Sequence, residues 1–189
     1  MRNTFKAGAA MLVVAAGIAL LSMPAGAGAH AVVSPFQPQT PPLTAARTLY
    51  VLRVPNEEES LVTYKVVMPV PPALQEAISV KPTPGWRTHL SRKWTGKTEK
   101  FGNEVFKIYA TSKITWTAKR GEGLYPGFFD DFFFRFQNPA QAQQICFPVF
   151  QFYGKARKSG RFKLAKTVNW NGPPNSESPA SCVNVLGTP

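Results

Sequence analysis

Proline is the residue that most limits what this chain can fold into. The 189 residues include eighteen prolines, which are spread along the chain between phenylalanine-rich and valine-rich segments. Proline breaks helix interiors, because it lacks the backbone N–H and its ring clashes with the preceding turn. An all-helical bundle is therefore excluded. The hydrophobic share of 44% is that of an ordinary globular protein, so wholesale disorder is excluded as well.

Segments rich in β-branched and aromatic residues, or alternating between apolar and polar residues, predict strands. The expected strands are 31–34, 48–54, 60–68, 86–93, 105–109, 113–117, 128–136, 145–153 and 162–170. Phe132, Phe134 and Phe136 share one face of their segment, which indicates a central strand of the core. We expect one helical turn within 73–80, a hairpin loop at 95–97 and a loop-like tail from Gly172. Short strands with almost no helix indicate an all-β, antiparallel β-sandwich of immunoglobulin-like or Greek-key type, in one domain.

Residues 1–29 have the pattern of a cleaved export signal. Arg2 and Lys6 begin the chain, an uncharged run extends from Ala7 to Leu21, and small residues lead to Ala29. The run is about fifteen residues long, short of the roughly twenty that a membrane-spanning helix needs. We therefore expect cleavage after Ala29, which leaves the domain 30–189 in the periplasm or outside the cell.

The net charge would by itself suggest a nucleic-acid-binding protein. It is +12, from 22 Lys and Arg against 10 Asp and Glu. Removal of the signal lowers it to +10, because Arg2 and Lys6 leave with it. An exported protein meets little nucleic acid, so no nucleic-acid partner is expected. Acidic sugars, lipid headgroups or an anionic cell wall are the expected weak contacts of a basic surface.

Cleavage after Ala29 would make His30 the first residue of the mature chain. Its free α-amine and its ring Nδ1 can then close a six-membered chelate around one metal ion. A free α-amine has a pKa of about 7.7–8.0, so a metal ion can displace its proton near neutral pH. Nitrogen ligands of this kind favour Cu(II), which has the highest affinity in the divalent series. The alternative is that His30 follows the cleavage site without binding a metal.

Few other side chains could complete a copper site. Met68, the only methionine after the signal, lies on the apolar face of its strand, which argues against a thioether Cu(I) site. His89 lies in a basic stretch and is expected at the surface of an edge strand. Cys146 and Cys182 are the only cysteines, and an oxidising compartment favours a disulfide that ties the tail to the Cys146 strand. Two separate thiols or a copper–thiolate site are the alternatives.

We expect a binding protein and not an enzyme. The sequence has no paired-histidine motif, no phosphate-binding glycine loop and no Gly-x-Ser-x-Gly nucleophile elbow. Asp130 and Asp131 are adjacent in a predicted strand, so their side chains should point to opposite faces and not cooperate. Glu57 lies in a charged turn, where its carboxylate could complete a metal site.

Several short motifs recur in the order typical of the YcnI-like bacterial copper-binding family. They are HAVVSP at 30–35, LRVPNE at 52–57, PGW at 84–86, GFFDDF at 127–132, FQFY at 150–153 and VNW at 168–170. The sequence resembles this family over nearly the whole mature chain. The resemblance implies an exported β-sandwich that binds Cu(II) through His30 and serves copper trafficking or homeostasis, with other exported or membrane copper-handling proteins as partners. It also implies that Trp170 lies beside the metal.

The sequence departs from the family at one ligand. Family members place an acidic ligand shortly before the Arg-Val-Pro-Asn-Glu turn, but no Asp or Glu occurs between His30 and Pro55. The carboxylate is therefore missing, replaced by Glu57 or Asp131, or supplied by another chain.

Two other functions fit parts of the sequence. A cell-wall- or polysaccharide-binding module would use Lys, Arg and exposed aromatic residues such as Trp94. An oxidative copper enzyme of the histidine-brace type would need a second histidine opposite His30, and His89 is the only one available.

Overall fold

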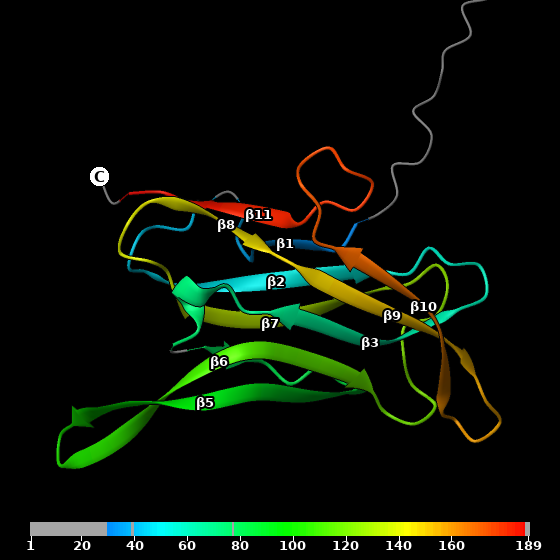
Figure 1. The fold of residues 1–189 in the computed structure, drawn as a ribbon, viewed down its shortest axis with the longest axis horizontal. Helices are drawn as coiled ribbons and strands as arrows, with labels where there is room; N and C mark the ends of the chain where they lie inside the picture. The colour runs from blue at the N-terminus through cyan, green and yellow to red at the C-terminus, as the bar shows by residue number, and fades with distance from the viewer. Residues whose placement is uncertain (1–29, 39, 77, 188–189) are drawn as a thin grey trace, which may run out of the picture.

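Strands with alternating apolar residues form two facing antiparallel sheets and a small third one (Figure 1). The computed structural model describes residues 30–38, 40–76 and 78–187, so the predicted signal at 1–29 lies outside the described residues. The strands are β1 (Val32–Pro35), β2 (Arg47–Pro55), β3 (Val62–Pro69), β4 (Ser79–Val80), β5 (Trp86–Phe101), β6 (Glu104–Ala118), β7 (Phe129–Gln137), β8 (Gln143–Phe147), β9 (Val149–Ala156), β10 (Phe162–Trp170) and β11 (Ser181–Val185). The only helix in the described ranges is the 3-10 turn η1 (Pro72–Leu74), and none there is long or apolar enough to cross a membrane.

The order of the strands confirms an all-β fold with antiparallel pairing. One sheet has the order β1-β2-β7-β4 and the other β10-β9-β3-β6-β5, while β11 pairs with β8 in a two-stranded sheet. In Figure 1 the strands β1, β2 and β7 form one layer, and β3, β6, β9 and β10 run along the other.

The core lies between the two sheets and is rich in aromatic residues. Phe132, Phe134 and Phe136 are buried on the central strand β7, as the alternation predicts. The ring of Tyr50 stacks on that of Phe136, with centroids 4.5 Å apart, and burial raises the pKa of Tyr50 to about 12. Its hydroxyl donates to Asn138 Oδ1 over 2.8 Å, so the buried phenol is satisfied. Met68 is also fully buried, as expected.

The prediction of a hairpin loop at 95–97 is wrong. Trp94 pairs with Tyr109 and Thr98 pairs with Lys107, so the intervening residues of β5 form a bulge opposite Ile108. Gly96 adopts a φ of 83° in this bulge. The chain turns at Gly102-Asn103 instead, and the two predicted strands 105–109 and 113–117 are one continuous strand, β6.

Two further boundaries differ from the prediction. The segment 145–153 is divided at Pro148 into β8 and β9, which belong to different sheets. The tail is not only loop, because β11 pairs along its whole length with β8. The predicted disulfide is confirmed: Cys146 and Cys182 lie opposite each other in this pair and are bonded.

Candidate metal centre

His30 lies at one end of the first sheet, directly before β1. Val32 is paired with Arg53, so continuation of this antiparallel register brings His30 to the level of Pro55, the last residue of β2. The imidazole of His30 is half-buried and packs against the indole of Trp170, with ring centroids 5.1 Å apart and planes tilted by 43°. Trp170 is the last residue of β10 in the other sheet. The structure therefore brings together the predicted ligand and the tryptophan predicted to lie beside it.

A buried glutamine holds the indole of Trp170 in place. Trp170 Nε1 donates to Gln151 Oε1 over 3.1 Å. The carboxamide nitrogen of Gln151 donates to the carbonyl of Pro55 and to Thr63 Oγ1, both over 2.8 Å. Because the indole N–H is already bonded, Trp170 meets His30 through its ring. An aromatic ring attracts cationic groups, so this position suits an imidazole that carries a metal ion.

Gln151 was not predicted from the sequence, although the pattern of β9 contains a signal for it. Val149, Gln151 and Tyr153 alternate along β9 and are all buried, with Gln151 fully so. A glutamine at an inward position between two apolar residues must find hydrogen-bond partners there. Its partners could not be read from the chain, since they come from the end of β2, from β3 and from β10.

Thr63 departs from the simple alternation of β3. Strict alternation would place it on the face opposite Val62 and Val66, but it is fully buried. The register of β3 against β9 shifts between Thr63 and Lys65, and this irregularity turns Thr63 inward. Its hydroxyl then accepts the bond from Gln151.

Glu57 lies two residues beyond Pro55, at the same end of the first sheet as His30. The neighbouring Glu58 forms an ion pair with Lys166 on β10. Burial raises the pKa of Tyr153, and the negative charges of Glu58 and Glu57 raise it further. Carboxylates of this turn therefore lie close to β9 and β10, the strands that hold Gln151 and Trp170.

Asp131 lies elsewhere and already has a cationic partner. It is paired across the sheet with Arg53, whose guanidinium donates two hydrogen bonds of 2.8 Å to its carboxylate. This bidentate contact raises the pKa of Arg53. Strand β2 stands between β7 and β1, so about two strand spacings, roughly 10 Å, separate Asp131 from the strand that follows His30. The structure does not bring Asp131 to His30.

Asp130 and Asp131 point to different partners, as expected for adjacent residues of a strand. Asp130 accepts a hydrogen bond of 2.7 Å from the indole of the buried Trp86, whereas Asp131 binds Arg53. The two carboxylates therefore do not form an acid–base pair.

The second histidine is far from the first. His89 is exposed on β5, the edge strand opposite to β10 in the five-stranded sheet, and this confirms the expected surface position on an edge. Four strand spacings of about 4.8 Å separate these edges, or roughly 19 Å. His30 and His89 therefore do not meet in a histidine brace.

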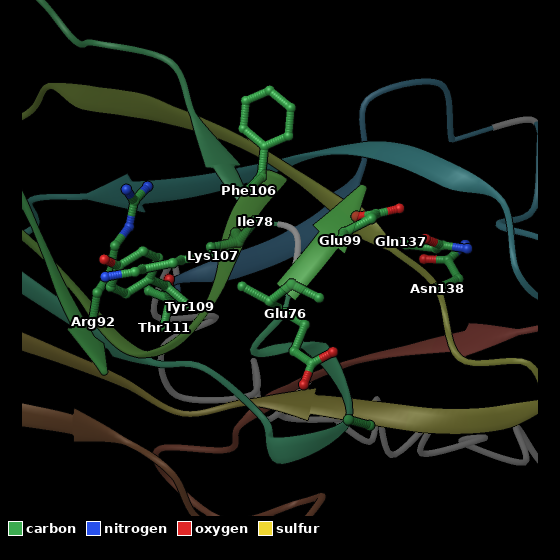
Figure 2. Close-up of a pocket in the computed structure, with 12 residues that line it drawn as sticks. Glu76, Ile78, Arg92, Glu99, Phe106, Lys107, Tyr109, Thr111, Gln137 and Asn138 are labelled. Carbon is green, nitrogen blue, oxygen red and sulfur yellow. The ribbon is translucent and has the colours of Figure 1, made fainter. Parts of the chain in front are cut away.

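A cavity of about 530 Å³ opens at another place, beneath the β5–β6 hairpin (Figure 2). Its lining carries both charges, since it includes Arg92 and Lys107 as well as Glu76 and Glu99. It contains neither histidine nor cysteine, so it offers no soft or imidazole ligand. The cavity is thus distinct from the site at His30.

Comparisons with known proteins agree with this fold. Residues 30–185 match the family described as "Domain of unknown function (DUF1775)". The chain belongs to the DUF1775 family. It is also 28% identical over 166 residues to the copper-binding protein CutI of Bacillus subtilis, covering 88% of this chain and 67% of that protein. The expected resemblance to the YcnI-like family is therefore confirmed.

A solved structure supports the immunoglobulin-like architecture of this DUF1775 domain. The crystal structure of an uncharacterized protein from Nocardia farcinica, said to reveal an immunoglobulin-like fold, superposes with a TM-score of 0.58. The two proteins share 22% identity, over 83% of this chain and 98% of that one. At this identity the likeness bears on the fold alone.

Proposed function

We propose that this DUF1775 protein is an exported copper-binding protein that holds Cu(II) through His30 and serves copper trafficking or homeostasis. The observation that carries the proposal is the packing of His30 against Trp170, whose indole is held by the buried Gln151. The name of the Bacillus subtilis relative, and a family match that begins at residue 30, support the same assignment. The confirmed disulfide is in keeping with export to an oxidising compartment.

The donor set depends on the free amine of His30. Among the described residues, no three or more His, Cys, Asp or Glu side chains gather where they could hold a metal ion. In the mature chain, cleavage after Ala29 would add the α-amine of His30 to its ring Nδ1, and the two nitrogens chelate one Cu(II) as cargo. Of the two proposed carboxylates we favour Glu57, because it follows Pro55, which lies at the level of His30, whereas Asp131 lies two strands away from β1.

The test compares the wild-type mature protein with three altered forms in Cu(II) titration and EPR. A chain whose α-amine is acetylated loses the chelating amine, and His30→Ala loses the imidazole. We expect each change to lower the affinity for Cu(II) by at least about a hundredfold, because a chelate is reduced to a single nitrogen ligand. His89→Ala is the matched control, since it removes the exposed histidine of β5, and it should titrate like the wild type. Unchanged spectra in the acetylated chain would disprove the terminal chelate.

A further inference from the structure

The hairpin formed by β5 and β6 extends past the rest of the sandwich (Figure 1). These strands have 16 and 15 residues, whereas none of the other strands in the described ranges exceeds nine. On β6, no residue from Glu104 to Ala110 is buried, and the first buried side chain is that of Thr111. The outer half of the hairpin therefore does not contribute to the core.

This outer half exposes large apolar side chains. The exposed fractions are 81% for Phe101, 64% for Val105, 49% for Phe106, 49% for Trp94 and 44% for Tyr109. Single exposed apolar residues are common on soluble proteins, but a cluster of them marks a surface that meets a partner. Phe101 and Val105 flank the turn at Gly102-Asn103, so the most exposed apolar groups are at the very end of the hairpin.

The same part of the hairpin is basic, with five Lys and Arg and two Glu between residues 92 and 109. The register places both glutamates on one face, together with Lys93, and most of the other cationic groups on the opposite face. Lys100 lies opposite Val105 and Lys107 lies opposite Thr98, on the face that also carries the pair Trp94 and Tyr109. We call this the cationic face; it consists of Arg92, Trp94, Lys100, Val105, Lys107 and Tyr109. Glu99 and Glu104 pair with Phe106 and Phe101 on the other face.

Local contacts hold the hairpin in this shape. Lys97, from the bulge of β5, forms an ion pair of 3.1 Å with Glu76 on the body of the domain. Thr95 Oγ1 donates to the carbonyl of Ile108 across the bulge over 2.9 Å. Lys107 Nζ lies 5.4 Å from the centre of the Trp94 ring, which it meets on the cationic face. The outer half is therefore an ordered projection, and Phe101 and Val105 at its end remain exposed to solvent.

We propose that the end of the β5–β6 hairpin docks on the surface of an anionic phospholipid bilayer. Phe101 and Val105, at the end of the hairpin, enter the headgroup layer, while Lys100 and Lys107 on the cationic face contact lipid phosphates. Aromatic residues favour the membrane interface, and lysines extend their apolar stems while they keep the ammonium group among phosphates. Charge complementarity favours an anionic over a neutral surface. An anionic cell-wall polymer is less suitable, because the fully hydrated polymer offers no apolar layer for Phe101 and Val105.

The test is sedimentation of the mature protein with vesicles made of equal parts phosphatidylglycerol and phosphatidylcholine. We expect binding to these vesicles, little binding to pure phosphatidylcholine, and weaker binding as salt is added. The variant Lys100→Glu/Lys107→Glu should lower partitioning at least about tenfold. The variant Phe101→Ser/Val105→Ser should lower it to a similar extent while it leaves the charge unchanged. Thermal unfolding of each variant checks that the domain is folded. We expect no loss of folding, because none of these side chains is buried.

A matched control separates the hairpin from the general basic charge of the protein. Lys155 and Lys163 are exposed and face each other across β9 and β10, so Lys155→Glu/Lys163→Glu makes the same charge change elsewhere. This control should retain nearly all vesicle binding.

Equal losses in the control and the hairpin variant would overturn the proposal, and so would binding to purified anionic wall polymer without binding to vesicles. A hairpin that joins two copies of the chain in the absence of lipid would overturn it too. Because the experiment contains no copper, its result is independent of the function proposed for His30.

Discussion

The two edges of the five-stranded sheet differ in which side chains they bury: polar ones are buried near one edge, and apolar ones are exposed at the other. Near the β10 edge, the polar side chain of Gln151 is fully buried, and both the oxygen and the nitrogen of its carboxamide have hydrogen-bond partners. At the β5 edge, Phe101 and Val105 are largely in solvent. A buried polar group fixes its neighbours, because any movement would leave a donor or acceptor unsatisfied. An exposed apolar group gains only when something covers it. The first edge is thus built to position His30 and Trp170, and the second to meet a surface.

The largest expected effect is the loss of the disulfide near the first edge. Cys146 and Cys182 close a loop of 36 residues, so Cys146→Ala/Cys182→Ala should lower the free energy of unfolding by roughly 3–4 kcal/mol. β11 also carries Ser181, whose hydroxyl bonds both the N–H and the C=O of Val33 in β1. Hydrogen exchange should therefore accelerate at the amide of Val33, three residues after His30. It should remain unchanged in the outer hairpin. Equal acceleration in both regions would contradict the distinction between the two edges.

Replacement of Gln151 by leucine comes next in size. Gln151→Leu keeps a similar volume but leaves Trp170 Nε1 and the carbonyl of Pro55 without their partner. We expect a loss of about 2 kcal/mol in urea unfolding, together with a shift of one indole N–H resonance in the NMR spectrum. Phe101→Ser, at the other edge, should change stability by less than about 0.5 kcal/mol.

The matched control for this change is Gln144→Leu. Gln144 is exposed on β8, and its amide donates to Asn184 over 3.2 Å at the surface. It should unfold like the wild type, because the exposed Asn184 Oδ1 can bond water instead. If Gln144→Leu and Gln151→Leu cost the same, the role of the buried network would be disproved.

Local patterns in the sequence predicted the elements better than their partners. The bounds of β10, 162–170, agree with the prediction, and the alternation of Phe132, Phe134 and Phe136 located the core. The glycine at 96 predicted a local departure from the strand, which is real. Whether such a glycine makes a bulge or a turn is decided by the strand opposite, since Trp94 and Thr98 both find partners on β6.

The candidate site shows the same division. His30 and Trp170 could be proposed from the family motifs, and the fold brings their rings together. The partner of Asp131 could not be predicted, because Arg53 is 78 residues away and meets it only through the register of β2 and β7. The three contacts of Gln151 depend on strand pairing in the same way. Sequence identifies which residue types are present, and the pairing of strands decides which of them are free to act.

The last effect is absent at neutral pH, develops only above about pH 10, and sharpens the comparison from the side of the core. Tyr50 and Tyr153 are buried in the sandwich, and burial raises the pKa of both, that of Tyr50 to about 12. A phenol unfolded in water loses its proton near pH 10, so above that pH the unfolded state binds fewer protons and stability must fall. Each buried tyrosine contributes a slope of about 1.4 kcal/mol per pH unit, present from about pH 10 and, for Tyr50, ending near pH 12. Tyr50→Phe should remove the contribution of Tyr50 to the pH slope of the free energy of unfolding, measured by urea unfolding. It also removes the hydrogen bond to Asn138, which lowers stability at every pH. Parallel profiles for wild type and Tyr50→Phe between about pH 10 and pH 12 would show that the sandwich admits solvent at Tyr50, as the outer hairpin does at its own aromatic residues.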